Sequence, residues 1–335
     1  MAIAKNSMQP LFSKLQKSGF DPKFVKTLLP EWWDDSLANT PSGYQQAALI
    51  LARIFAIKPD SLWSAESNPV FAIPENRKFK HSANTEPDEL DVACALAFSA
   101  AKIVSSGLEA LPFLSELPSA SRLREQLLKE HKWVGLEELV DYCYSIGIPV
   151  IYLEKFPAGA KKMHGLAFDC NGRPVIVLTR KHKRGYLLFD LAHELGHIAL
   201  NHLAHGGFIV DRVISADEDN GDDDERAANR FALELLTGDP EKRIKPANRN
   251  LRTTELASAA LIYAQQHNIH PTHVAMNYGY TTKHWPVANG AVNILEHGKP
   301  TDCEILKDAL FRNLDQDEMK EDDASALKGM VGLES

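Results

Sequence analysis

The chain lacks an apolar run long enough to cross a bilayer, which takes about 20 residues. Its longest uncharged apolar stretch, residues 92–101, is half that length and is bounded by Asp91 and Lys102. Residues 1–10 also lack the apolar segment and the small-residue cleavage site of a secretory signal peptide. We therefore expect a cytoplasmic protein with no membrane association.

Cysteine is scarce, and the four that occur, Cys94, Cys143, Cys170 and Cys303, form no C-x-x-C pair. This spacing argues against a thiolate zinc knuckle or a redox pair and predicts reduced, buried thiols. An excess of positive charge is also missing, because the formal net charge is −8. A protein that coats nucleic acid with its whole surface is therefore disfavoured.

With 335 residues, of which 44% are hydrophobic, the chain can bury a sizeable core in two or three domains. Breaks at Pro, Gly and Asn predict four regions: a helical module (1–66), a linker and connecting helix (67–120), a mixed helix and strand region (121–240), and a helical C-terminal region with an acidic tail (241–335). The charged residues 315–323 are expected to be frayed. The predicted fold class is α+β.

A β-hairpin is expected within the third region, with arms at residues 164–169 and 174–179. The Asn171-Gly172 pair between the arms is a strong hairpin signal because both residues tolerate positive φ. Helices are predicted before the hairpin, over residues 88–111 and 135–145, and after it, over residues 186–202, 223–236, 253–266 and 271–276.

The strongest chemical signal is His193-Glu194-Leu195-Gly196-His197 inside an amphipathic helix. Two histidines at i and i+4 project from one helix face, so their imidazoles can bind one tetrahedral zinc ion. Glu194 points elsewhere but can accept the proton of a water molecule that the metal activates. An isolated histidine pair is more often a surface cap, but the Glu after the first His favours a metal site. Gly196 is expected to let this helix approach a strand or a ligand closely.

A catalytic zinc site needs a third protein ligand and an open position. The downstream acids form a crowded group, and most are expected to be a solvated helix N-terminus. Asp224 and Glu225 both border the apolar face of the following helix, so periodicity does not choose between them. The group comprises Asp217, Glu218, Asp219, Asp222, Asp223, Asp224 and Glu225.

The segments 193–197 and 225–232 (ERAANRFA) together resemble the ImmA/IrrE metallopeptidase family, whose motifs are HE-hydrophobic-GH and E-x-x-A-N-x-F-A. The resemblance covers roughly residues 123–236 and implies a minimal thermolysin-like zincin fold. It also implies that Glu225 is the third zinc ligand and that Asn229 lies behind the ligands, with Asp224 as the fallback ligand. By the same analogy, the arm 174–179 is expected to be an edge strand that pairs with an extended substrate.

Some members of this family are regulatory proteases that cleave a helix-turn-helix repressor or antitoxin and so derepress its target genes, and others belong to toxin-antitoxin or phage-defence operons. The resemblance therefore implies a zinc endopeptidase with a protein substrate of that kind. Residues 44–62 look like the last helices of a helix-turn-helix domain, but residues 30–35, where a recognition helix should be basic, are acidic and aromatic. DNA contact is therefore weakly supported. The alternative is a DNA-binding regulator or antitoxin whose peptidase-like domain only binds a partner.

Stabilising the transition state at the scissile carbonyl needs a hydrogen-bond donor besides the metal. Five side chains are candidates, and the sequence does not rank them: His164, Tyr186, His205, His273 and Tyr278.

Overall fold

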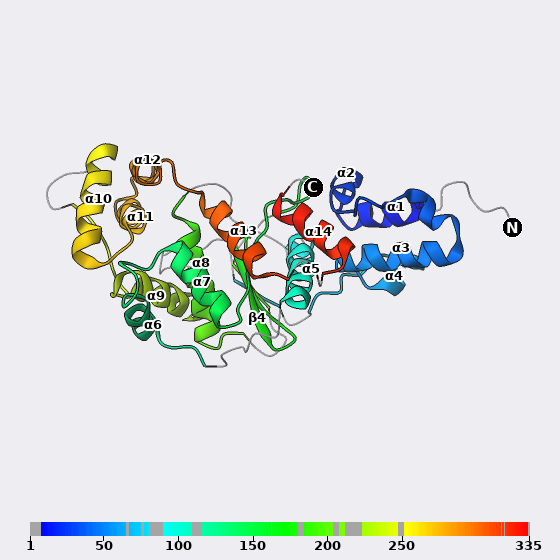
Figure 1. Cartoon of the computed structure of the whole chain (residues 1–335), viewed down its shortest axis with the longest axis horizontal. Coiled ribbons are helices and arrows are strands. Elements are labelled where there is room, and N and C mark those ends of the chain that lie inside the picture. The colour runs from blue at the N-terminus through cyan, green and yellow to red at the C-terminus, as the bar shows by residue number, and fades with distance from the viewer. Residues whose placement is uncertain are drawn as a thin grey trace.

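A five-stranded mixed sheet lies near the middle of an elongated, mostly helical molecule (Figure 1). The predicted α+β class is confirmed. Within the described part of the chain, no helix is long and apolar enough to cross a membrane. The computed structural model describes residues 8–64, 67–74, 77–80, 90–108, 116–161, 163–179, 184–203, 208–211, 223–246, 251–315, 317 and 319–333.

Short helices form the N-terminal end of the molecule, and a side chain caps the start of both α2 and α3. The Asp21 side chain accepts a hydrogen bond from the Phe24 N–H, and the Thr40 side chain accepts one from the Gly43 N–H. Residues 30–34 form a turn and loop rather than a recognition helix. The elements are α1 (Gln9–Lys17), α2 (Pro22–Lys26), the 3₁₀ helix η1 (Asp35–Asn39), α3 (Pro41–Ile54) and α4 (Pro59–Trp63).

The long helix α5 (Asp91–Gly107) joins these N-terminal helices to the sheet. Most of its side chains are buried, and one continuous apolar core extends from α1 through α5 to the strands. The Phe98 ring of α5 lies 5.8 Å from the Phe168 ring of the sheet, centroid to centroid. The N-terminal helices therefore share their core with the mixed region.

The sheet confirms the predicted hairpin, with positive φ at both turn residues, +57° at Asn171 and +86° at Gly172. The strand order is β1-β5-β3-β4-β2. The expectation that residues 174–179 form an edge strand is wrong, because β4 lies between β3 and β2. The strands are β1 (Arg77–Lys80), β2 (Val150–Tyr152), β3 (Gly165–Cys170), β4 (Arg173–Leu178) and β5 (Phe208–Asp211).

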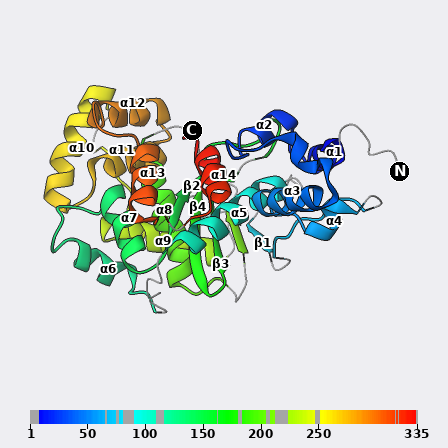
Figure 2. The same ribbon diagram turned by 45° about the vertical axis from the view of Figure 1, so that its right-hand side comes forward.

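Helices α5 and α8 cover opposite faces of the sheet. Gly165 of β3 faces α8, whereas Phe168 of the same strand contacts α5, and alternate residues of a strand point to opposite faces. Helix α9 packs along α8 on the side away from the strands (Figure 2). The helices of this region are α6 (Ala120–Leu127), α7 (Leu136–Ser145), α8 (Leu187–Ala199) and α9 (Asp223–Thr237).

Three helices form a second apolar core at the far end of the molecule (Figure 1): α10 (Thr253–His267), α11 (Pro271–Thr282) and α12 (Trp285–Leu295). The chain then returns. Helix α13 (Asp302–Asn313) packs against α7 and β2, and α14 (Glu321–Val331) packs against α5 and α3.

The prediction of a frayed acidic tail is wrong for the end of residues 315–323. Asp322 and Asp323 lie in the first turn of α14, where both pair with Arg53 of α3. Leu327 and Met330 follow on the same helix and are buried in the main core. The acidic residues are therefore the start of a docked helix rather than solvated chain.

The buried side chain of Arg124 is one of the links between the second core and the rest of the protein. The Arg124 guanidinium of α6 donates to the carbonyls of Leu235 and Leu236 at the end of α9, at 3.1 and 2.9 Å. It also donates to the carbonyls of His267 and Asn268 at the end of α10, at 3.3 and 2.7 Å. Positive charge is favourable at helix C-termini, so Arg124 connects two of them.

Replacing Arg124 by Ala is expected to lower the free energy of unfolding by roughly 2–4 kcal/mol, because four carbonyls lose a charged donor. Arg122→Ala is the matched control, since that exposed side chain lies on the same helix. Urea titration of both variants measures the difference. Equal stability would mean that the Arg124 contacts contribute little.

Candidate metal centre

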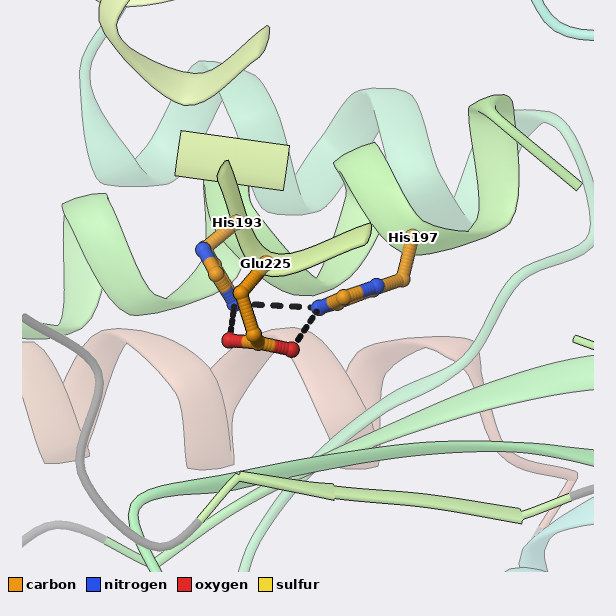
Figure 3. A group of neighbouring side chains, drawn as sticks. All are labelled: His193, His197 and Glu225. Atoms are coloured by element: carbon orange, nitrogen blue, oxygen red, sulfur yellow. Dashed lines mark hydrogen bonds and ion pairs between the residues drawn. The ribbon is translucent and has the colours of Figure 1, made fainter. Parts of the chain in front are cut away.

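The structure brings His193, His197 and Glu225 together (Figure 3). The two Nε2 atoms lie 3.1 Å apart. Glu225 Oε2 lies 3.4 Å from His193 Nε2, and Glu225 Oε1 lies 3.2 Å from His197 Nε2. Both imidazoles are 0% exposed, and the Glu225 side chain is 13% exposed.

These separations fit a common metal ion. Donor atoms about 2.05 Å from a tetrahedral zinc ion lie about 3.3 Å from one another. The three distances of 3.1, 3.2 and 3.4 Å are close to that value. Three ligands leave the fourth corner of a tetrahedron open. The His-His-Glu group could therefore hold a metal ion while leaving one position for another molecule.

Close packing of α8 against α9 creates this arrangement. A Cβ at Gly196 would lie 3.1 Å from the Phe231 ring and 3.2 Å from the Ala228 carbonyl. Glycine was expected to allow the approach of a strand or ligand, but the neighbour is helix α9. The residues that follow Glu225 in its motif thus hold the two ligand-bearing helices together.

Each histidine is oriented through its second ring nitrogen. His193 Nδ1 lies 3.0 Å from Asn229 Oδ1, the partner that the motif implied. Because an amide oxygen can only accept, this contact favours the tautomer of His193 with its proton on Nδ1, which leaves Nε2 available to a metal.

His202 supports the second histidine, a role that the sequence reasoning missed. Its Nδ1 lies 2.9 Å from His197 Nδ1, and its Nε2 lies 3.7 Å from Asp224 Oδ1. Asp224, the fallback ligand, therefore contacts His202 rather than the His193 and His197 pair. The available signal was another histidine just beyond the C-terminus of the same helix.

Glu194 is fully buried and faces β3. A Cβ at Gly165 would lie 1.9 Å from Glu194 Oε1 and 2.8 Å from its Cδ, so the carboxylate rests directly over the glycine backbone. Gly165 was predicted only as part of a strand. Its role depends on an approach between helix and strand that sequence patterns do not specify.

The start of α8 is anchored from the C-terminal region. The Gly185 N–H donates to Asp302 Oδ2 of α13 at 2.8 Å. Burial raises the pKa of Asp302 to about 6, although its backbone hydrogen bonds to Gly185 and Leu187 act in the opposite direction. Helix α13 therefore helps to position the helix that carries both histidines.

The candidates for transition-state stabilisation are mostly directed elsewhere. The Tyr186 hydroxyl contacts Asn289 of α12 at 3.2 Å, and the Tyr278 hydroxyl accepts a hydrogen bond from the Leu251 N–H. The His273 ring is buried and stacks on Phe189. Among the described candidates, His164 is the one that directly precedes Gly165 in the chain. His205 and the acids Asp217 to Asp222 lie outside the described residues.

Glu225→Ala is expected to weaken zinc binding much more than Asp224→Ala. Glu225 contacts both histidines, whereas Asp224 lies 3.7 Å from His202 and is not in the His-His-Glu group. Losing an outer partner costs about 10- to 100-fold in metal affinity, so Glu225→Ala should exceed this range. Competition with a chromophoric chelator measures both affinities. The reverse order would make Asp224 the third ligand.

The geometry agrees with a comparison against known protein families. Residues 143–262 match Peptidase_M78, the IrrE N-terminal-like domain. A comparison with curated proteins and a comparison with solved structures each found no match. The matched residues contain all three members of the His-His-Glu group. Residues 143–262 therefore form an IrrE N-terminal-like domain of the Peptidase_M78 family, and the chain is a metalloendopeptidase.

Proposed function

We propose that His193, His197 and Glu225 bind zinc and that Glu194 is the general base for hydrolysis of a peptide bond. The observation that carries this proposal is the set of donor separations between 3.1 and 3.4 Å, the edges of a tetrahedral zinc site. When bound, zinc would acidify a water molecule and polarise the scissile carbonyl.

The protein supplies orientation and a base. Asn229 and His202 hold the two imidazoles so that their Nε2 atoms face Glu225. Glu194 follows His193 in the helix, which keeps its carboxylate next to the ligands without joining them. Because that carboxylate lies over β3, a peptide bond brought along this strand would come within its reach.

For the substrate, we propose a helix-turn-helix repressor or antitoxin whose cleavage derepresses its target genes in a stress, phage-defence or toxin-antitoxin setting. The support is the family match and the paired motifs around His193 and Glu225. An endopeptidase cuts an extended segment, so the cleaved part of the regulator would have to be a loop or a locally unfolded stretch.

The test combines metal analysis with a search for products. Purified chain should contain about one zinc ion, given three ligands in one site. Co-expression with a helix-turn-helix protein encoded next to it should yield two fragments that mass spectrometry can assign to one cleavage position. A chain that binds no transition metal and leaves the regulator intact would contradict the proposal.

For residues 8–64 we propose a scaffold for the protease or for its partner rather than a DNA reader. Their core is continuous with α5 and the sheet, and residues 30–34 are not helical. A mobility-shift assay with duplex DNA at about 50 mM salt tests this point, because phosphate contacts are strongest at low salt. Retention of the DNA would favour the DNA-binding alternative.

Gly165→Ala should lower the rate of cleavage by about 100-fold while zinc stays bound, because displacing a catalytic group by about 1 Å has an effect of this size. The added methyl group would overlap Glu194 Oε1 and push the carboxylate aside. Gly172→Ala is the control. It strains the turn of the same hairpin at φ +86° but meets nothing within 4 Å. Equal activity in the two variants would show that Glu194 does not need this position.

A further inference from the structure

Strand β3 runs beside the proposed base and is paired on both sides. On one side it forms the hairpin with β4. On the other side it pairs antiparallel with β5, from Gly165 opposite Asp211 to Phe168 opposite Phe208. Strand β1 then covers the outer side of β5 in parallel orientation. Gly165, the β3 residue that lies against Glu194, is therefore paired with Asp211 of β5.

A protein substrate needs a backbone partner at this position. Extended peptides are commonly held by adding a strand to an exposed sheet edge, where main-chain hydrogen bonds fix their register. A peptide paired with β3 would lie about 4.8 Å from Gly165, and so beside Glu194. One side of β3 is occupied by β4, which is joined to β3 by a two-residue turn and is itself paired with β2. The only remaining side of β3 is the one that β5 occupies.

The site is buried, as expected if β5 occupies the position that a substrate strand would take. His193, Glu194 and His197 are all 0% exposed. Within β5, Ile209 is 1% exposed and Val210 is 0% exposed, so its apolar side chains fill space on both faces of the sheet. A substrate cannot reach the base in this conformation unless a covering segment moves.

We propose that β5 is an internal substitute for the substrate strand, and that it keeps the site closed until it is displaced from β3 together with β1. This inference rests on the proposed function. Exchange of one antiparallel strand for another conserves the main-chain hydrogen bonds of β3. The incoming segment is therefore selected by how well its side chains replace those of β5. The matching segment is extended and carries aliphatic residues at the positions of Ile209 and Val210.

Two disulfide pairs that share one substitution test the proposal. Ala167 lies opposite Ile209 of β5 and also opposite Ile176 of β4. The pair Ala167→Cys with Ile209→Cys locks β5 in place. The pair Ala167→Cys with Ile176→Cys locks the hairpin, which stays paired in any case. Peptide mapping confirms each crosslink in the zinc-loaded full chain, and tris(2-carboxyethyl)phosphine opens it.

The measured quantity is the rate of regulator cleavage after reduction divided by the rate before reduction. We expect a ratio of at least about 100 for the β5 lock and about 1 for the β4 lock, with zinc content unchanged, because only the first lock prevents a local opening. Equal ratios for the two locks would overturn the proposal.

Hydrogen exchange separates this proposal from the proposed function. If no reduced variant cleaves the regulator, the proposed function fails, and exchange in the unmodified chain decides the role of β5. The amides of Phe208–Asp211 should then exchange at least about 100-fold faster than those of residues 175–178, because β5 leaves while β4 stays. Equal protection of both strands would show that β5 opens only with the whole fold.

Discussion

His197→Ala is expected to leave the protein with almost no zinc, below about 0.1 ion per chain after dialysis, because two ligands rarely retain the ion. The substitution removes one of three donor atoms that lie within 3.4 Å of one another. It also deprives His202 of the ring nitrogen that it contacts at 2.9 Å. Elemental analysis by mass spectrometry, beside a protein assay, gives the zinc content directly.

His267→Ala is the matched control for this loss. His267 lies at the end of α10, near His270 and His273 in the sequence, but these residues do not form a metal-binding group in the described part of the chain. Its removal should leave zinc content unchanged. A zinc-replete His197→Ala protein, or an equal loss in both variants, would place the metal elsewhere.

The pairing of His193 with His197 could be predicted because both residues lie on one helix, where spacing fixes direction. The third member was harder to identify. Asp224 and Glu225 are adjacent and border the same apolar face, so periodicity treated them alike. The structure separates them through the packing of α9 on α8, which turns Glu225 toward the histidines and Asp224 toward His202. That packing depends on a contact between two helices.

Long-range pairing explains most of what the sequence did not predict. The hairpin was predicted because its two strands are joined by a turn with its own signature. In contrast, β1 and β5 are short, come from distant parts of the chain and find each other only in the folded sheet. The order of the strands, and with it the interior position of β4, follows from these pairings. Local patterns alone therefore misplaced the edge of the sheet.

The C-terminal tail was mispredicted for a local reason. The acidic composition of residues 315–323 suggested a frayed end, whereas the apolar residues that follow them indicate a helix. Acidic residues up to Asp323 suggested a solvated segment. The next turns of the same helix carry Leu327 and Met330, whose spacing forms an apolar face. Arg53 then supplies the charge that Asp322 and Asp323 need at a partly buried helix start. An acidic helix N-terminus followed by an apolar face indicates docking rather than disorder.

Glu194→Gln should reduce cleavage of the regulator by roughly 10²- to 10⁴-fold while zinc and fold are retained, because it removes the base and leaves the ligands intact. Glutamine has nearly the same size and fits the same buried position over Gly165. The regulator should still bind, so the variant is expected to trap it as a stable complex. Expressing wild type and variant with the regulator, followed by immunoblotting and zinc analysis, measures cleavage and metal content together. Derepression by both proteins with the regulator intact would mean that the domain acts by binding, and Glu194 would then have no role as a base.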